Sequence, residues 1–147
     1  MSRPHQKILC SILIGLNLWL IWGNSAMTGE ESGNLSGWLQ QFLAFLPQSP
    51  LFETVLRKLA HFSEFALLGL LMGWMSVLLK ERTFPGLLGL GLTVACIDET
   101  IQYFVPGRAS MLLDVWIDAA GFTAGLTLLT IGYTIYKRTH ILEETKS

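Results

Sequence analysis

Four long apolar segments, separated by shorter polar stretches, dominate the pattern of hydrophobic and polar positions along the chain. An α-helix rises about 1.5 Å per residue, so each segment could cross most or all of a hydrocarbon layer about 30 Å thick. Helices satisfy their own backbone hydrogen bonds in lipid, so we expect an all-α, polytopic membrane bundle. The four predicted transmembrane spans run from Ile8 to Gly23, from Leu59 to Leu79, from Phe84 to Val105 and from Met111 to Tyr136.

The segment between the first two spans, residues 24–50, has a different pattern. Residues 29–37 are small and polar, which predicts a loop. Apolar residues then recur at three- and four-residue steps over 35–46 and predict a short amphipathic helix that Pro47 ends. It would lie on the outer membrane interface or cap the bundle.

Ser49 and Pro50 predict the start of the next helix, because serine is a common N-cap and proline is favoured at the first helical position. This helix would begin about two turns before the apolar part of the second span. Lys58 would then lie near the lipid headgroups, with His61 just below them.

The first span is the shortest, and its basic start and the small residues 24–26 after it also fit a cleaved signal peptide. The asparagine at position 24 is unfavourable for cleavage, whereas Trp19 and Trp22 are typical of an interfacial anchor. We therefore expect a retained helix.

The lysines and arginines predict the orientation of the bundle. Basic residues prefer the cytoplasmic side of a membrane, so the side with more of them should be cytoplasmic. With four spans, seven of the ten would share the side of both termini: Arg3, Lys7, Lys80, Arg82, Lys137, Arg138 and Lys146. The other side would carry Arg57, Lys58 and Arg108. We expect cytoplasmic termini.

Composition agrees with a single membrane domain over residues 1–147. The chain is 51% hydrophobic and only 14% charged, against roughly a quarter charged in typical soluble domains. The net charge of -1 and the lack of a basic cluster give no indication of nucleic-acid binding. Cys10 and Cys96 lie in apolar segments near opposite ends of the predicted bundle, which favours two buried free thiols over a disulfide.

Ionisable residues inside the predicted spans are the main functional signal, because each costs a few kcal/mol at membrane depth and is rarely present without a use. Asp98 and Glu99 are adjacent, and other polar residues precede and follow them. The predicted ligand-binding set, all in the outer half of the membrane or at its outer surface, is Lys58, His61, Glu64, Asp98, Glu99, Gln102, Arg108, Asp114 and Asp118.

Helical geometry predicts that these residues share one pocket. Asp114 and Asp118 lie one turn apart, and a stripe of glycines continues their face toward the other end of the helix. Small residues at four-residue spacing let helices approach closely, so this face should point into the bundle, under the 105–108 turn. The glycines are Gly69 and Gly73 in the second span and Gly121 and Gly125 in the fourth.

Simple structural pairing, such as Lys58 with Glu64 or Arg108 with Asp114, is the competing interpretation of these charges. The carboxylates outnumber the cations, however, so some would be protonated or would meet a divalent cation or a cationic ligand. Oxygen-rich sites with one imidazole suit Mg²⁺, Mn²⁺ or, less well, Zn²⁺. The candidate metal ligands, which are also the candidate catalytic residues, are His61, Glu64, Asp98 and Glu99.

At these residues the chain resembles the VanZ-like family of small bacterial integral membrane proteins. The resemblance covers a core of residues 58–125 and rests on three polar motifs in order, over 58–69, 98–108 and 114–125. Phe65 stands where a tyrosine is common, and Asp118 stands where asparagine is usual. The second difference adds a negative charge to the predicted pocket.

The resemblance implies a role in the cell envelope, near the outer face of the bacterial cytoplasmic membrane. The family takes its name from a protein associated with low-level resistance to the glycopeptide teicoplanin, and it brings no established chemistry. Besides the lipid bilayer, the partners it suggests are lipid-linked envelope precursors or a glycopeptide.

Three function classes follow from these residues. In a binding or envelope-modulating protein, Lys58 and Arg108 would engage a phosphate or carboxylate of an outer-leaflet ligand. In a membrane-embedded hydrolase or transferase acting on a lipid-linked phosphate, His61 would act as general base or metal ligand, and Arg108 would stabilise developing charge. A proton- or cation-coupled carrier would use the surplus carboxylates, but no internal repeat or broken helix supports it.

Overall fold

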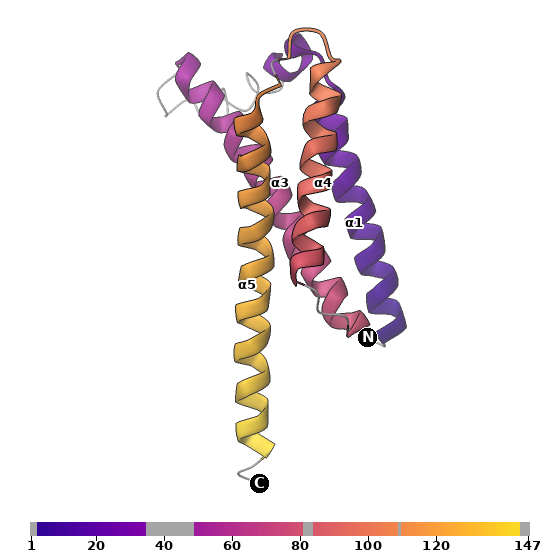
Figure 1. The fold of residues 1–147 in the computed structure, drawn as a ribbon. Helices are drawn as coiled ribbons and strands as arrows, with labels where there is room; N and C mark the ends of the chain where they lie inside the picture. The colour runs from indigo at the N-terminus through magenta and orange to yellow at the C-terminus, as the bar shows by residue number, and fades with distance from the viewer. Residues whose placement is uncertain (1–2, 35–48, 81–83, 109, 145–147) are drawn as a thin grey trace.

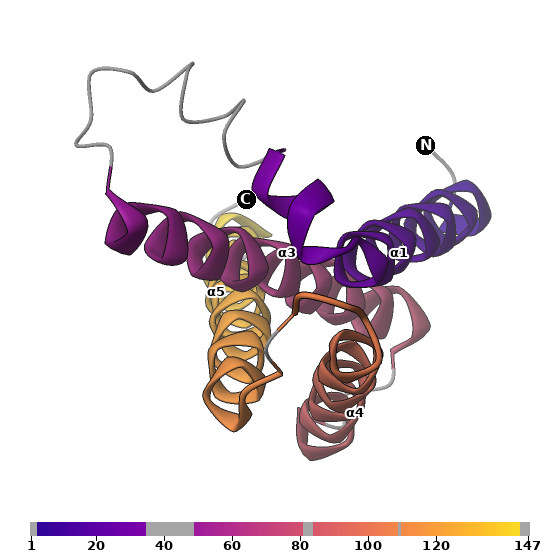
Figure 2. The same ribbon diagram turned by 90° about the horizontal axis from the view of Figure 1, so that it is seen from above.

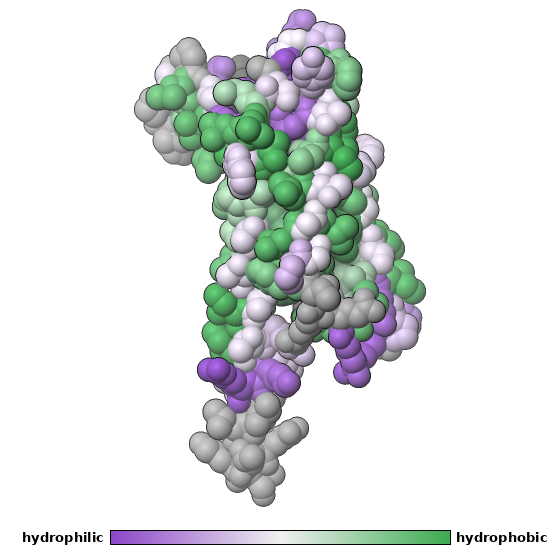
Figure 3. All heavy atoms as spheres, in the orientation of Figure 1, coloured by the Kyte–Doolittle hydropathy of each residue, from purple (hydrophilic) through white to green (hydrophobic). Residues whose placement is uncertain are grey.

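Four long helices make up the computed structural model, which describes residues 3–34, 49–80, 84–108 and 110–144 (Figure 1). The described residues contain no β-strand, and every one of the four helices is long and apolar enough to span a membrane. On the face shown in Figure 3, apolar and weakly polar side chains cover the middle, and the strongly hydrophilic ones lie toward the two ends. The helices are α1 (Arg3–Ala26), α3 (Pro50–Leu79), α4 (Phe84–Tyr103) and α5 (Leu112–Glu144).

Both ends of the described chain lie at the same end of the bundle (Figure 1). α1 and α4 run away from that end, whereas α3 and α5 run back toward it. α3 crosses the bundle obliquely, packing mainly on α5 and also on α1 (Figure 2). The opposite end, which we call the polar end, holds the C-terminus of α1 and the N-termini of α3 and α5. It also holds the turn between α4 and α5, which is described at 104–108 and 110–111 and is called the 104–111 turn below.

The start of α3 confirms the predicted capping signal. Ser49 has an extended backbone, and its Oγ accepts a hydrogen bond of 3.2 Å from the backbone N–H of Phe52. Pro50 follows at the first helical position. At the other end of α3, Lys80 adopts the left-handed conformation, with φ 61°, and ends the helix at the turn toward α4.

A short helical segment over 29–34 replaces the predicted loop there, so that prediction was wrong. Thr28 and Glu31 form a capping box: the backbone N–H of Glu31 donates to the Thr28 hydroxyl, and both the backbone N–H and the hydroxyl of Thr28 donate to the Glu31 carboxylate at 2.9 Å. These bonds hold the pKa of Glu31 below its usual value. The predicted amphipathic helix over 35–46 and Pro47 lie outside the described residues.

The two predicted glycine stripes face each other where α3 and α5 pack. A Cβ added to Gly125 would overlap the backbone carbonyl of Ala66, and one added to Gly121 would overlap that of Phe62. Gly69 is equally close to the backbone of α5. The prediction that these stripes point into the bundle is confirmed, and they bring the polar residues of α3 and α5 within reach of one another.

Below the polar residues, a small apolar core joins all four helices. The core is formed by Ile21, Phe65, Leu68, Ala95, Val115, Phe122 and Leu126. Cys10 is buried beside α3, and its thiol lies 3.3 Å from the carbonyl oxygen of Leu71. Cys96 is exposed on the surface of α4, so its predicted burial was wrong, although both cysteines are free as expected.

Candidate functional site

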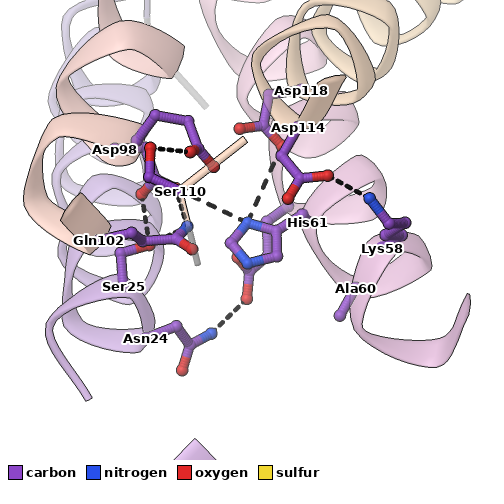
Figure 4. Close-up of polar contacts among 12 residues, drawn as sticks. Asn24, Ser25, Lys58, Ala60, His61, Asp98, Gln102, Ser110, Asp114 and Asp118 are labelled. Atoms are coloured by element: carbon purple, nitrogen blue, oxygen red, sulfur yellow. Dashed lines mark hydrogen bonds and ion pairs between the residues drawn. The ribbon is translucent and has the colours of Figure 1, made fainter. Parts of the chain in front are cut away.

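The buried carboxylate of Asp98 lies at the centre of the polar end. It is fully buried, and its two oxygens accept separate hydrogen bonds: 2.6 Å from the hydroxyl of Ser25 on α1 and 2.9 Å from the amide of Gln102 (Figure 4). Gln102 lies one helical turn after Asp98, and its amide also donates to the Ser25 hydroxyl at 3.2 Å. The α4 face predicted from this spacing is thus held against α1.

His61 on α3 lies between carboxylates of two other helices. Its Nδ1 is 3.7 Å from an oxygen of Asp98 and 3.9 Å from an oxygen of Asp118 on α5 (Figure 4). Both separations are too long for direct hydrogen bonds. Asp118 is fully buried, and neither of its side-chain oxygens has a hydrogen-bond partner in the described part of the chain.

Two further predicted carboxylates accept hydrogen bonds from α1 and from the start of the α5 segment. Glu64 accepts a 2.5 Å hydrogen bond from the side-chain amide of Asn24 on α1. Glu99 accepts from the Ser110 hydroxyl at 2.7 Å and from the backbone N–H of Met111 at 2.9 Å, which fixes the start of the α5 segment. Each of these two carboxylates has one further buried oxygen for which the described residues provide no partner.

Arg108 fastens the turn between α4 and α5 to the end of α1. Its guanidinium donates to the carbonyl oxygen of Asn24 at 2.5 Å through Nη2 and to that of Met27 at 3.2 Å through Nε. Burial lowers the pKa of Arg108, and the positive charge of Arg57 lowers it further. Within the described residues its hydrogen-bond partners are these two backbone carbonyls, and no carboxylate forms an ion pair with it.

Lys58 pairs with Asp114 across the α3–α5 interface (Figure 4). The two structural pairs considered from sequence, Lys58 with Glu64 and Arg108 with Asp114, are not formed: Glu64 is bonded to Asn24 instead. Asp114 is half-buried, so this pair neutralises Lys58 at the mouth of the site.

A cavity of about 70 Å³ lies among these side chains, between α3, α5 and the 104–111 turn. Six of the nine predicted ligand-binding residues line it, whereas Glu64, Asp98 and Glu99 do not. The charged and polar lining is Thr54, Arg57, Lys58, His61, Gln102, Arg108, Asp114 and Asp118, with Met111 and Ile117 as the apolar part. Three of these side chains are permanently cationic.

A group that could hold a metal ion is formed by His61, Asp98 and Asp118, whose ligand atoms all lie within 4.8 Å of one another. It shares His61 and Asp98 with the candidates predicted from sequence. The third member of the group is Asp118. The other two predicted candidates are not part of it, because Glu64 binds Asn24 and Glu99 binds the start of the α5 segment.

Several contributors to the site were not predicted, among them Asn24, Ser25, Arg57 and Ser110. Asn24 and Ser25 were considered only as a possible cleavage region, yet both carry hydrogen bonds to buried carboxylates. Asn17, another buried polar residue of α1, lies seven positions before Asn24 and eight before Ser25, which places all three on one face of the helix. That periodicity could have indicated Asn24 and Ser25. Ser110 and Arg57 carried no periodic signal of their own.

The comparisons with known proteins agree with the earlier resemblance and extend it. The VanZ/LLP1 family matches residues 10–135, a range that takes in most of α1 as well as the three polar motifs. No curated protein and no solved structure matches the chain. Because α1 supplies Ser25 and Asn24 to the buried carboxylates, the family region includes every helix that builds the site. This chain belongs to the VanZ/LLP1 family, and it is a multi-pass membrane protein.

Proposed function

We propose that this protein binds the anionic headgroup of a lipid-linked envelope component in the cavity at its polar end. The observation that carries the proposal is the position of Arg57 and Arg108. Both line the cavity, and neither forms an ion pair with a carboxylate in the described parts of the chain. Arginine is suited to phosphate and carboxylate groups because its planar guanidinium can donate two parallel hydrogen bonds.

Arg57, rather than Lys58, would bind the anion together with Arg108. Lys58 is already paired with Asp114, so an incoming anion would have to compete with that carboxylate. Arg57, one residue earlier on α3, is exposed and lines the same cavity. Arg108 offers a donor left over from its two bonds to α1.

The size of the cavity supports a headgroup rather than a whole antibiotic. A volume of about 70 Å³ is well below the roughly 300–1,000 Å³ of pockets that enclose a drug-sized ligand. That room suits a single phosphate or carboxylate group and excludes a glycopeptide. Any effect on teicoplanin-type susceptibility would then follow from binding the lipid-linked precursors on which such antibiotics act.

The side of the membrane follows from the positive-inside rule. Lys80 and both chain termini share the end of the bundle opposite the cavity, and Lys7, Lys137 and Arg138 belong to that end as well. We therefore place the termini in the cytoplasm and the cavity at the outer face of the bacterial cytoplasmic membrane.

Arg57→Gln tests the proposal most cleanly, because Arg57 has no carboxylate partner in the described chain whose loss would disturb the fold. In nanodiscs, wild type should bind a polyprenyl monophosphate more tightly than the neutral polyprenol of equal length. Arg57→Gln should reduce the affinity for the phosphate by about 10-fold or more, as one charge-assisted hydrogen bond contributes about 1.5–3 kcal/mol.

Arg138→Gln is the matched control, since it removes an exposed arginine near the far end of α5. It should leave the affinity for the phosphate unchanged. Equal binding of the phosphate and the neutral lipid by wild type, or equal losses in both variants, would contradict the proposal.

Catalysis on the same ligand is a second candidate, and the position of His61 favours it. This imidazole lines the cavity and has Asp98 and Asp118 behind it, an arrangement in which it could accept a proton from water near a bound phosphate. Release of inorganic phosphate from a polyprenyl phosphate by wild type, but not by His61→Gln, would establish this activity. Intact substrate after prolonged incubation with wild type would exclude it for that substrate.

A further inference from the structure

The group formed by His61, Asp98 and Asp118 has three features that together indicate a ligand between its members. The three residues come from α3, α4 and α5, so the group closes the space where these helices meet. His61 lies 3.7 Å from Asp98 and 3.9 Å from Asp118. Atoms bound to one ion at about 2.1 Å are separated by about 3.0–3.4 Å. The ligand atoms of this group all lie within 4.8 Å of one another, so contraction by less than about 2 Å would close the group on an ion.

Asp118 supplies the independent observation. Its side chain is only 1% exposed, and one of its oxygens is among the atoms that face His61. Both oxygens lack a hydrogen-bond partner in the described chain. An ionised carboxylate without a partner is costly to bury, and it is more costly in a protein surrounded by lipid.

The charges around the group favour a cation as that missing partner. Glu64, Asp98, Glu99 and Asp118 are buried or half-buried within this end of the bundle. The nearest cations do not balance these four carboxylates, because Lys58 is paired with Asp114 and only Arg108 and the exposed Arg57 remain among the cations that line the cavity.

We propose that His61, Asp98 and Asp118 bind a divalent transition-metal ion, Mn²⁺ or Zn²⁺, at the floor of the cavity. One imidazole nitrogen with two carboxylates suits these ions better than Ca²⁺, which prefers six or more oxygen ligands. Ser25 and Gln102 orient Asp98 through its two hydrogen bonds, as residues around a metal ligand commonly do. The ion site does not depend on the anionic ligand, so either proposal can fail alone.

Metal retention by purified full-length protein tests this site. After exposure to Mn²⁺ or Zn²⁺ and removal of free ions, wild type should retain one ion per chain by elemental analysis, and it should not retain Ca²⁺. Asp118→Asn, which preserves the side-chain size, should weaken retention at least 100-fold, since loss of a supporting residue alone typically costs 10- to 100-fold. With bound Mn²⁺, pulsed electron paramagnetic resonance should detect one imidazole nitrogen, and His61→Gln should abolish that signal.

Glu99→Gln is the matched control. It removes the charge of the carboxylate next to Asp98, and that Glu99 carboxylate binds Ser110 and Met111 rather than the ion. The variant should retain the ion. If Asp118→Asn does not give monodisperse helical protein, His61→Gln carries the same test. No retained ion in wild type, as expected if the carboxyl groups are protonated, or retention unaffected by His61→Gln, would overturn the proposal.

Discussion

Gly125→Leu should leave little folded protein. Gly125 lies where α5 crosses α3, and even a methyl group at this position would overlap the backbone carbonyl of Ala66. A backbone cannot rotate away as a side chain can, so the helices would have to separate. Overpacking commonly costs about 1–3 kcal/mol, and we expect at least the upper end of that range. Thermal unfolding in detergent, followed by circular dichroism and size-exclusion chromatography, would measure the loss.

Gly132→Leu provides the comparison within the same helix. A Cβ at Gly132 would have no neighbour within 4 Å in the described structure. A leucine there would face lipid, and it should leave the unfolding temperature unchanged or raise it, because leucine favours helix more than glycine does. Equal stability of the two variants would show that α3 and α5 are not packed as described.

Arg108→Gln should destabilise the protein by about 3 kcal/mol. The substitution removes two charge-assisted hydrogen bonds to the carbonyls of Asn24 and Met27. Each such bond contributes about 1.5–3 kcal/mol, and the lower value applies because Arg108 is only half-buried. The turn at 104–111 would keep the hydrogen bond that the Gly29 N–H donates to the Pro106 carbonyl, but it would lose these two bonds to the end of α1, which also positions Ser25 and Asn24 against their carboxylates. The free energy of unfolding in a denaturing-detergent titration would measure this effect.

Arg57→Gln should leave the free energy of unfolding unchanged in the same titration, because Arg57 is exposed and forms no ion pair within the described residues. Arg108 is therefore expected to contribute to both stability and ligand binding, whereas Arg57 is expected to contribute to ligand binding alone. If Arg108→Gln lowered the free energy of unfolding no more than Arg57→Gln does, the bonds of Arg108 to Asn24 and Met27 would contribute nothing to stability.

The helices and the inward faces could be predicted from sequence because both depend on local patterns. Apolar length defined the four spans, and Ser49-Pro50 defined the start of α3. Spacing of one helical turn placed Gly121 and Gly125 on an inward face, and the structure confirms that placement. Each of these patterns can be recognised within a single helix, without knowing how the helices pack.

Pairing between helices could not be predicted in this way, because it depends on how far each helix is rotated and shifted against its neighbours. Lys58 pairs with Asp114 rather than with Glu64, although Glu64 is much nearer in sequence. Glu64 turns toward α1 and meets Asn24 there. The loop prediction failed over 29–34 for a local reason: Thr28 and Glu31 have the spacing of a capping box, and that signal outweighs the small residues between and after them.

A ligand of the outer leaflet can reach the cavity only if the polar end of the bundle faces outward, and cysteine labelling measures this directly. Glu30→Cys, exposed beside the polar end, should react with a membrane-impermeant maleimide in intact cells, with Cys10 and Cys96 replaced by alanine. Arg138→Cys, at the opposite end, should react only after the membrane is opened. Labelling of Arg138→Cys but not of Glu30→Cys in intact cells would contradict the proposed orientation and the outer-leaflet ligand with it.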